Sequence, residues 1–163
     1  MGFINRLKEE HVREWYLKHS HLGVLEDLAD RVEEQGYALD TKSGLFVKPH
    51  FGEVITEELG YTIVDIIFPR PSNYHFHTDV GEAIRVLNGS GAIIVGNDGD
   101  YTSSDFGKGW QTIVYSNQHH AFRPDRERFL EIRVCCTGIL DPKKEVTVTR
   151  FDEFTPWLEY FGE

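Results

Sequence analysis

The chain has 163 residues, 40% of them hydrophobic and 13% aromatic, which suffices for one packed core and is too apolar for a disordered chain. A formal net charge of −10, with no cluster of Lys and Arg, excludes nucleic acid as an expected partner. No stretch approaches the roughly 18 apolar residues of a membrane span, and the charged N-terminus lacks the apolar region of a signal peptide, so we expect no membrane partner.

The N-terminal part is predicted to be helical from residue 3 to about residue 36, with a break near Ser20. Gly36 lies where a helix commonly ends in a left-handed residue. Apolar residues after the break recur at helical spacing and predict a packing face: Leu22, Leu25, Leu28, Ala29 and Val32. We therefore expect residues 1–40 to form a helical extension that packs on one domain, residues 41–163.

After Ala38, short runs rich in Val, Ile, Phe and Tyr alternate with Gly, Asn, Asp and Pro, which is typical of strands joined by turns. The runs are LFVKPHF, GEVITEEL, YTIVDIIF, YHFH, EAIRVL, GAIIVG, QTIVYS, HHAF, RFLEIRVCC and EVTVTRF. NGSG at residues 88–91 and NDGD at residues 97–100 are strong turn signals. The pattern predicts an all-β sandwich or barrel, and TPWLEYF predicts a short helix after it.

Two histidines separated by one residue begin the most informative segment. In a strand, His75 and His77 share one face, about 6–7 Å apart, while Tyr74 and Phe76 share the other. The turn that follows lets the next strand present Glu82 beside them. Two imidazoles and a carboxylate are a common ligand set for iron, manganese, nickel or zinc.

The pair His119-His120 offers a third histidine, because only one of two adjacent strand residues points inward. Phe122 shares a face with His120, whereas Ala121 shares one with His119. Since the interior of a barrel is apolar, the face of His120 and Phe122 is expected inside.

These residues resemble the first motif of the cupin superfamily, G-x5-H-x-H-x(3,4)-E-x6-G. His75, His77, Glu82 and Gly89 match it, and Pro69 stands where the first Gly is expected.

The second cupin motif, G-x5-P-x-G-x2-H-x3-N, is matched by Gly109 and His120. Tyr115, Asn117 and Pro124 replace its Pro, second Gly and Asn. Asn is the residue that best imitates Gly at a left-handed position, so the exchange at Asn117 is mild.

The resemblance covers residues from about 44 to 151. It implies a cupin jelly-roll β-barrel of the all-β class, with N-terminal α-helices and a short C-terminal helix, open to substrate at one end. It implies one divalent metal ion with the ligands His75, His77, Glu82 and His120. Pairing of cupins through their sheets implies a homodimer.

Three histidines and one glutamate leave one or two positions open on a five- or six-coordinate ion. By analogy with the small metal-binding cupins that the sequence resembles, we favour a Fe(II) or Mn(II) enzyme, with Ni(II) or Zn(II) as alternatives, that acts on a small polar or carboxylated substrate as a dioxygenase-type oxidoreductase. The alternatives are a metal-dependent sugar isomerase or lyase and a non-catalytic small-molecule-binding module. A metal-free epimerase is disfavoured by the intact HxHx4E pattern.

Candidate catalytic residues around the ion are Arg85 and Tyr115, with Arg70 as a further inward-facing candidate. An arginine there would clamp a substrate carboxylate, although arginines in strands more often form ion pairs on the exterior. Cys135 and Cys136 are adjacent, and a disulfide between neighbours is strained. We therefore interpret them as small apolar residues that pack within a strand. The cysteine usage favours the cytoplasm.

Overall fold

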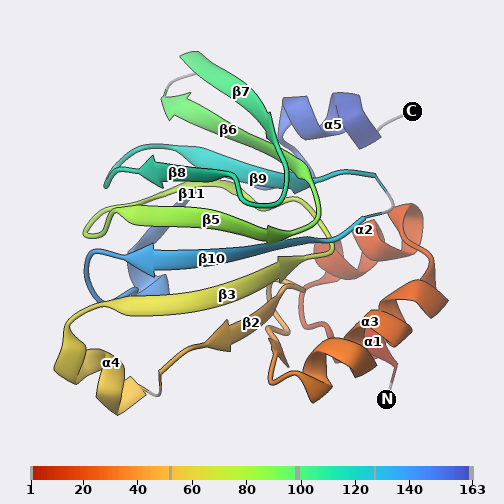
Figure 1. Ribbon diagram of the computed structural model, residues 1–163. Helices are drawn as coiled ribbons and strands as arrows, with labels where there is room; N and C mark the ends of the chain where they lie inside the picture. Colours follow the sequence, from red (N-terminus) through yellow and green to blue (C-terminus); the bar gives the residue numbers. More distant parts are fainter. Residues whose placement is uncertain (1, 52, 98–99, 127, 162–163) are drawn as a thin grey trace.

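The computed structural model describes residues 2–51, 53–97, 100–126 and 128–161 (Figure 1). Its α-helices are α1 (Phe3–Arg6), α2 (Glu10–His19), α3 (Leu22–Glu34), α4 (Glu53–Leu59) and α5 (Thr155–Phe161), with a 3-10 turn at Pro142–Lys144. Its strands are β1 (Ala38–Leu39), β2 (Phe46–Pro49), β3 (Thr62–Phe68), β4 (Tyr74–His77), β5 (Glu82–Asn88), β6 (Gly91–Asn97), β7 (Asp100–Phe106), β8 (Gln111–Val114), β9 (His120–Pro124), β10 (Leu130–Cys136) and β11 (Glu145–Thr149).

The strands of the described residues form two antiparallel sheets that pack face to face as a jelly roll. Sheet A has the order β1-β2-β3-β10-β5-β8, and sheet B has the order β11-β4-β9-β6-β7. The predicted all-β jelly roll is therefore confirmed. Between the described strands the two sheets are not joined into one closed cylinder by hydrogen bonds, so the molecule is a sandwich with two pairs of edge strands.

The core between the sheets follows from alternation along each strand. In β5, Ile84 and Val86 are buried while Ala83 and Arg85 are exposed, and β10 alternates in the same way. Inward residues of both sheets make one apolar cluster: Val64, Phe68, Val80, Ile84, Val86, Ile93, Phe106, Val114, Phe122, Leu130, Ile132, Val134 and Cys136. This cluster supports the floor of the cavity described below.

The N-terminal helices pack on the outside of the sandwich, at the end of β2 and β3 (Figure 1). Phe3 is fully buried, with its ring centroid 5.1 Å from that of Tyr16 and 5.8 Å from that of Phe46. The predicted break near Ser20 is present, and Gly36 has a φ of 95° after α3. β1 already pairs with β2, so sheet A begins before residue 41, and the division of the chain at residue 40 stays a prediction.

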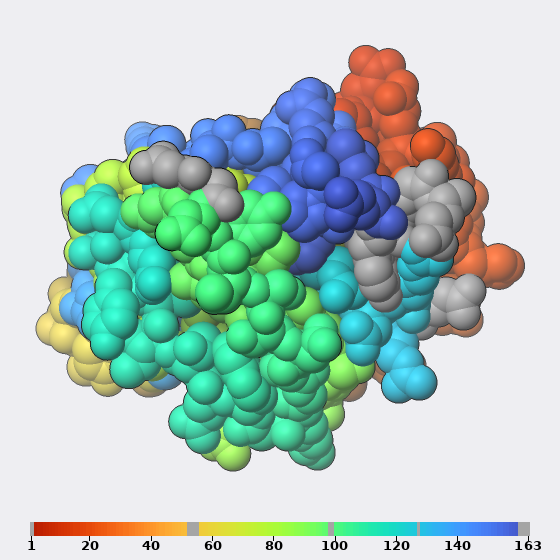
Figure 2. Space-filling view, turned by 90° about the horizontal axis from the view of Figure 1, so that it is seen from above, coloured from red at the N-terminus to blue at the C-terminus, as the bar shows by residue number. Residues whose placement is uncertain are grey.

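The C-terminal helix α5, predicted from TPWLEYF, covers the outer face of sheet B. Trp157 donates a hydrogen bond from Nε1 to the carbonyl of Ser72 (3.2 Å), and Phe154 stacks on Tyr74 with centroids 4.7 Å apart. In Figure 2 this segment (dark blue) lies beside the β6 region (green), with the N-terminal helices (red) beyond it. The first and the last helix thus lie on the same side of the sandwich (Figure 1).

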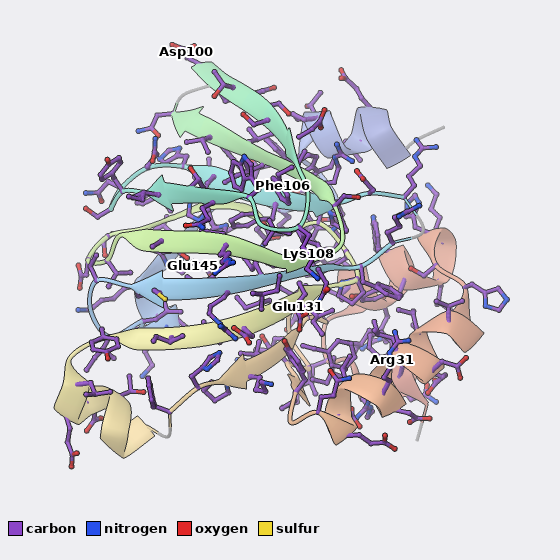
Figure 3. All side chains as sticks on the ribbon, in the orientation of Figure 1. Arg31, Asp100, Phe106, Lys108, Glu131 and Glu145 are labelled. Carbon is purple, nitrogen blue, oxygen red and sulfur yellow. The ribbon has the colours of Figure 1, made fainter. Side chains whose placement is uncertain are left out.

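Two elements differ from the sequence prediction. The run GEVITEEL was predicted as a strand, but residues 53–59 form α4. Strand β7, whose ends are labelled by Asp100 and Phe106 in Figure 3, was not predicted because its residues are almost all polar and exposed. It pairs with β6 along its full length. Of the turn predicted at NDGD, residues 98 and 99 lie outside the described residues.

The turn between β9 and its preceding strand contains a backbone conformation that favours Gly or Asn. Asn117 has a φ of 63°, which confirms that Asn replaces the second Gly of the motif at a left-handed position. Its backbone N–H donates to the carbonyl of His77 (2.7 Å), which ties this turn to β4 beside His120. Among the helices of the described part of the chain, none is long and apolar enough to span a bilayer.

Candidate metal centre and its cavity

The candidate site is built from both sheets. His75 and His77 lie on β4 and His120 on the neighbouring β9, so sheet B supplies three imidazoles. Glu82 is the first residue of β5 in sheet A and faces them across the core. The short 78–81 connection carries the chain from one sheet to the other, and Gly81 N–H donates to Thr137 Oγ1 (2.9 Å) beside it.

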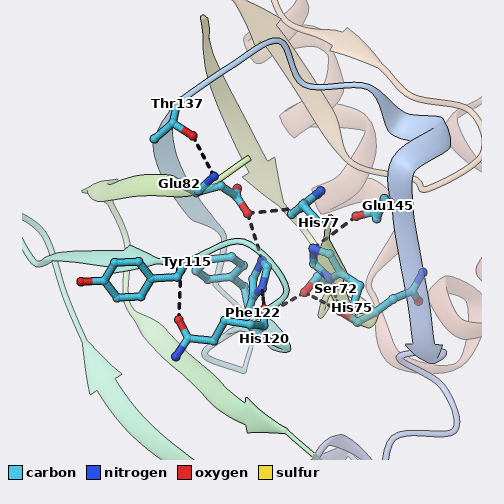
Figure 4. Close-up of polar contacts among 12 residues, drawn as sticks. Ser72, His75, His77, Glu82, Tyr115, His120, Phe122, Thr137 and Glu145 are labelled. Carbon is cyan, nitrogen blue, oxygen red and sulfur yellow. Dashed lines mark hydrogen bonds and ion pairs between the residues drawn. The ribbon is translucent and has the colours of Figure 1, made fainter. Parts of the chain in front are cut away.

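The three histidines form one cluster, and Glu82 contacts two of them, His77 and His120 (Figure 4). One nitrogen from each of the three histidines lies within 4.8 Å of the others. Glu82 Oε1 is 3.1 Å from His77 Nε2 and 3.2 Å from His120 Nε2. All four residues are buried, so water does not solvate their polar atoms freely.

Backbone carbonyls set the tautomer of two of these histidines. His75 Nδ1 is 2.7 Å from the carbonyl of Asn73, and His120 Nδ1 is 3.0 Å from the carbonyl of Gln118. A carbonyl only accepts, so each Nδ1 carries the proton. Each Nε2 therefore presents a lone pair to the centre of the cluster, as in histidines that bind metals.

The lone pair of His120 Nε2 points toward another hydrogen-bond acceptor, a carboxylate oxygen of Glu82. His120 Nε2 faces Glu82 Oε1 at 3.2 Å, and both atoms are buried without a hydrogen-bond partner among the described residues. Two acceptors in contact repel each other unless a proton or a metal ion lies between them, and buried unsatisfied polar atoms are costly. The geometry thus fits a positively charged ion shared by these side chains.

The buried cluster also shifts pKa values. Burial is the main cause that lowers the pKa of His75 to about 3, with a further contribution from the nearby His120, so His75 is neutral at pH 7. Burial alone would raise the pKa of Glu82, but contacts with His120 and His77 outweigh it and hold the pKa well below its usual value. Burial lowers the pKa of His77 less than Glu82 raises it, so the net shift is upward. An ionised Glu82 beside the neutral imidazole of His75 is a protonation state that suits metal binding.

A cavity of about 590 Å³ opens onto the cluster and lies between the two sheets. Its wall is mostly apolar, with residues such as Leu45, Val64, Phe68, Phe122 and Leu140. Its polar residues, apart from the four already named, are Asp40, Lys42, Ser43, Arg70, Ser72, Asn73 and Glu145. An apolar cavity of this size with a few polar groups at defined points is typical of a small-molecule site.

The two candidate catalytic residues, Arg85 and Tyr115, do not line this cavity in the structure. Arg85 is exposed because it is three residues after Glu82 in β5, and odd spacings along a strand place side chains on opposite faces. Tyr115 follows β8 and is 68% exposed, and its ring points away from the cluster (Figure 4). Neither side chain is positioned to touch a molecule bound at the cluster.

Arg70 does line the cavity and is only 3% exposed. Its Nε donates to the carbonyl of Ser43 (2.5 Å), a second nitrogen donates to the carbonyl of Pro71, and its guanidinium lies 3.9 Å from the ring centre of Phe151. Among the described residues, no ion pair joins Arg70 to a carboxylate. Arg133, in contrast, pairs with Asp65 on the outer face, as arginines in strands often do.

Glu145 is the residue at the site that sequence reasoning missed. It begins β11, which pairs with β4 so that Glu145 lies opposite His77, and its Oε1 is 3.2 Å from His75 Nε2. Figure 3 labels it in the strand half of the molecule, away from the helical end marked by Arg31. No local pattern in EVTVT indicates that this strand adds to the histidine strand.

No family model matches the sequence, and no curated protein matches it with significant similarity. Solved structures do match the fold. Pac13 from Streptomyces, described as a nucleoside dehydratase, is 16% identical with a TM-score of 0.55, covering 71% of this chain and 88% of its own. A cupin-2 domain from Rhodospirillum rubrum, Rru_A2000, is 16% identical with a TM-score of 0.52, covering 70% of this chain and 68% of its own.

A third similar structure is the capsular polysaccharide assembling protein CapF from Staphylococcus aureus, at 13% identity and a TM-score of 0.54. The match covers 69% of this chain and 34% of CapF. Together with the jelly roll and the buried histidine cluster, these similarities show that the protein has the fold of the cupin superfamily. At such identities they establish the fold alone, and a shared activity does not follow from it.

Proposed function

We propose that the protein is a metal-dependent enzyme of the cupin fold, in which His75, His77, Glu82 and His120 hold one divalent ion. The observation that carries this proposal is the contact between His120 Nε2 and Glu82 Oε1, two buried acceptors at 3.2 Å without a hydrogen-bond partner among the described residues. Nitrogen and carboxylate oxygen ligands suit Fe(II) or Mn(II), with Ni(II) and Zn(II) as alternatives. A bound ion of this kind supplies Lewis acidity or electron transfer next to the cavity.

The substrate is a small polar or carboxylated molecule that enters the 590 Å³ cavity. Arg70 takes the role that the sequence reasoning gave to Arg85, because it is the buried guanidinium on the cavity wall. Its contacts to the carbonyls of Ser43 and Pro71 neutralise none of its charge. A substrate carboxylate would therefore gain a charge-assisted hydrogen bond in an apolar cavity, which offsets its desolvation.

A dioxygenase-type oxidation is the reaction that we favour for an Fe(II) or Mn(II) ion in this site. A lyase reaction is the second candidate, because Pac13, similar in fold, is described as a nucleoside dehydratase and another of its structures contains uridine. The third candidate is a protein that binds a small molecule without catalysing a reaction. Oxygen consumption separates the first from the others, and product formation without oxygen identifies the second.

The experiment begins with metal analysis of protein purified without chelating resins. The expected result is one ion per chain in the wild type and loss of the ion in Glu82→Ala, with the fold preserved by circular dichroism. Oxygen uptake is then measured with Fe(II) and Mn(II) across carboxylic acids, thiols and sugars. Failure of every divalent metal to bind would refute the metal centre, and binding without turnover of any substrate would leave the binding module.

We also infer a homodimer in the cytoplasm. Two edge strands carry exposed apolar side chains that a second copy would cover, Ile113 in β8 and Val146 and Val148 in β11. Cys135 and Cys136 are both free thiols, which is typical of reducing compartments. Light scattering that gives a mass of 18.8 kDa, that of one chain, would refute the dimer.

A further inference from the structure

We propose that Glu145 is a fifth protein ligand of the metal centre. This inference rests on the proposed function, because it requires the ion held by the three histidines and Glu82. It adds a residue that lies outside both cupin motifs, about 25 residues after the second motif's histidine. The argument depends on strand pairing, on the tautomer of His75 and on the ion pairs around Glu145.

Strand pairing brings Glu145 to the cluster from the side opposite to Glu82. β11 is the edge strand of sheet B and pairs with β4, with Glu145 opposite His77 and Thr147 opposite His75. Glu82 comes from sheet A. The histidines therefore lie between two carboxylates, and Figure 4 shows Glu145 and Glu82 on opposite sides of His77.

The contact between Glu145 and His75 repeats the contact between Glu82 and His120. Oε1 of Glu145 is 3.2 Å from Nε2 of His75, the same distance as between Glu82 Oε1 and His120 Nε2. His75 donates its Nδ1 proton to the carbonyl of Asn73, so its Nε2 lone pair faces the carboxylate. Two acceptors at this distance are favourable neighbours only with a proton or a metal ion between them, and one metal ion held by Glu82 and His120 would satisfy both contacts.

The neighbouring cation does not neutralise Glu145. Lys144 pairs with Asp79 instead, and none of the ion pairs among the described residues joins Glu145 to a Lys or Arg. Glu145 lines the cavity, and its side chain is 39% exposed. Glu145 thus lies on the cavity wall beside the cluster, and within the described part of the chain its only ion-pair partner is His75.

A site of three nitrogens and two carboxylate oxygens differs from a structural zinc site, which is closed with four ligands. The two carboxylates balance the charge of a divalent ion. A six-coordinate ion retains one position for substrate after five protein ligands. Oxygen-rich sites with higher coordination numbers favour Fe(II) and Mn(II) over Zn(II). A fifth ligand from Glu145 therefore strengthens the proposed preference for Fe(II) or Mn(II).

The test compares Glu145→Gln and Glu145→Asp with Asp79→Asn in the full chain. Asp79→Asn removes one negative charge close to Glu145 in the chain fold, because Asp79 pairs with Lys144, the residue before Glu145, and not with a histidine. Mn(II) affinity is measured by titration calorimetry, and the number of ligands by the visible spectrum of bound Co(II), whose bands intensify as the coordination number falls. We expect Glu145→Gln to weaken Mn(II) binding by roughly tenfold or more and to intensify the Co(II) bands.

Glu145→Asp is expected to fall between Glu145→Gln and the wild type, and Asp79→Asn to behave like the wild type. Unchanged Mn(II) affinity and an unchanged Co(II) spectrum in Glu145→Gln would overturn the inference and leave the four-ligand centre standing. The competing explanation is that Glu145 only forms an ion pair with a protonated His75. It predicts this unchanged affinity and unchanged spectrum. Absence of metal binding in the wild type would instead refute the proposed function itself, so the two failures are distinct.

Discussion

His75 and His120 are direct cross-strand partners between β4 and β9, and their ring centroids lie 4.3 Å apart. The same register forces His119 to the outer face of sheet B, where its ring stacks on Phe76 with centroids 4.6 Å apart. Two adjacent histidines therefore have different surroundings. His120 faces the cluster, and His119 packs against the rings of Phe76 and Tyr74 on the outer face.

This difference predicts opposite effects on metal content. His120→Ala removes a ligand and should reduce metal affinity by more than about 100-fold, beyond the usual effect of changing a residue that only supports a ligand. His119→Ala should leave one ion per chain, because the ring of His119 packs on Phe76 and Tyr74 on the outer face of sheet B. Metal content after dialysis measures both. Loss of the ion in His119→Ala with retention in His120→Ala would contradict the assignment.

Substitution of Arg70 should affect carboxylated substrates and spare the metal. Arg70→Lys keeps a charge but loses the forked donors and the stacking on Phe151, so binding of a carboxylated substrate from the screen should weaken by about tenfold or more. Arg85→Gln is the matched control, since Arg85 is exposed outside the cavity. Titration calorimetry with metal-loaded protein measures both. Equal effects of the two substitutions would exclude a substrate contact by Arg70.

A buried carboxylate on the outer face of sheet A makes stability depend on pH. Burial would raise the pKa of Asp65, but contacts with Arg133 (2.9 Å) and His50 (3.0 Å) outweigh it and hold the pKa below its usual value. The stabilisation is therefore full above the unfolded pKa of about 4 and is lost as the pH falls through the lower folded pKa.

Arg133→Gln should accordingly lower the free energy of unfolding by about 2 kcal/mol at pH 7, the typical value for a hydrogen bond to a charged group. The difference from the wild type should shrink at pH 3, where Asp65 in the unfolded chain is protonated. Urea unfolding at the two pH values measures it. A difference that is equal at both would show that Arg133 acts through packing and not through the Asp65 charge.

The helical extension should be an integral part of the fold. Phe3→Ala removes a fully buried ring that contacts Tyr16 and Phe46, and should lower the free energy of unfolding by about 3–5 kcal/mol. Leu17→Ala is the control, because Leu17 is 57% exposed, and should change stability by less than about 0.5 kcal/mol. Denaturant unfolding compares them. Similar small effects would mean that α1 is dispensable.

The period of two along a strand explains why much of the site could be predicted from the sequence. It places His75 and His77 on one face and separates His120 from His119, so local spacing alone selects these side chains. Applied to β5, the same rule places Arg85 opposite to Glu82, and the candidate role of Arg85 did not take this into account. Alternation thus gives the direction of a side chain once a strand is recognised.

Glu145 could not be predicted, because its position depends on the pairing of β11 with β4, strands about 70 residues apart in the sequence. Strand β7 was missed because hydrophobic alternation is the main strand signal, and an exposed polar edge strand lacks it. The run at residues 53–59 was misread because a short mixture of β-branched residues, Leu and Glu is compatible with a strand or a helix, and periodicity does not separate the two at this length.

The proposed ligands come from both sheets, which has a consequence for how a bound ion would be released. An ion bonded to Glu82 in sheet A and to the histidines in sheet B cross-links the halves of the sandwich. Release of the ion and parting of the sheets at that end then become linked equilibria. The melting temperature should rise with free metal concentration, and hydrogen exchange at β4 and β5 should slow together when the ion is bound.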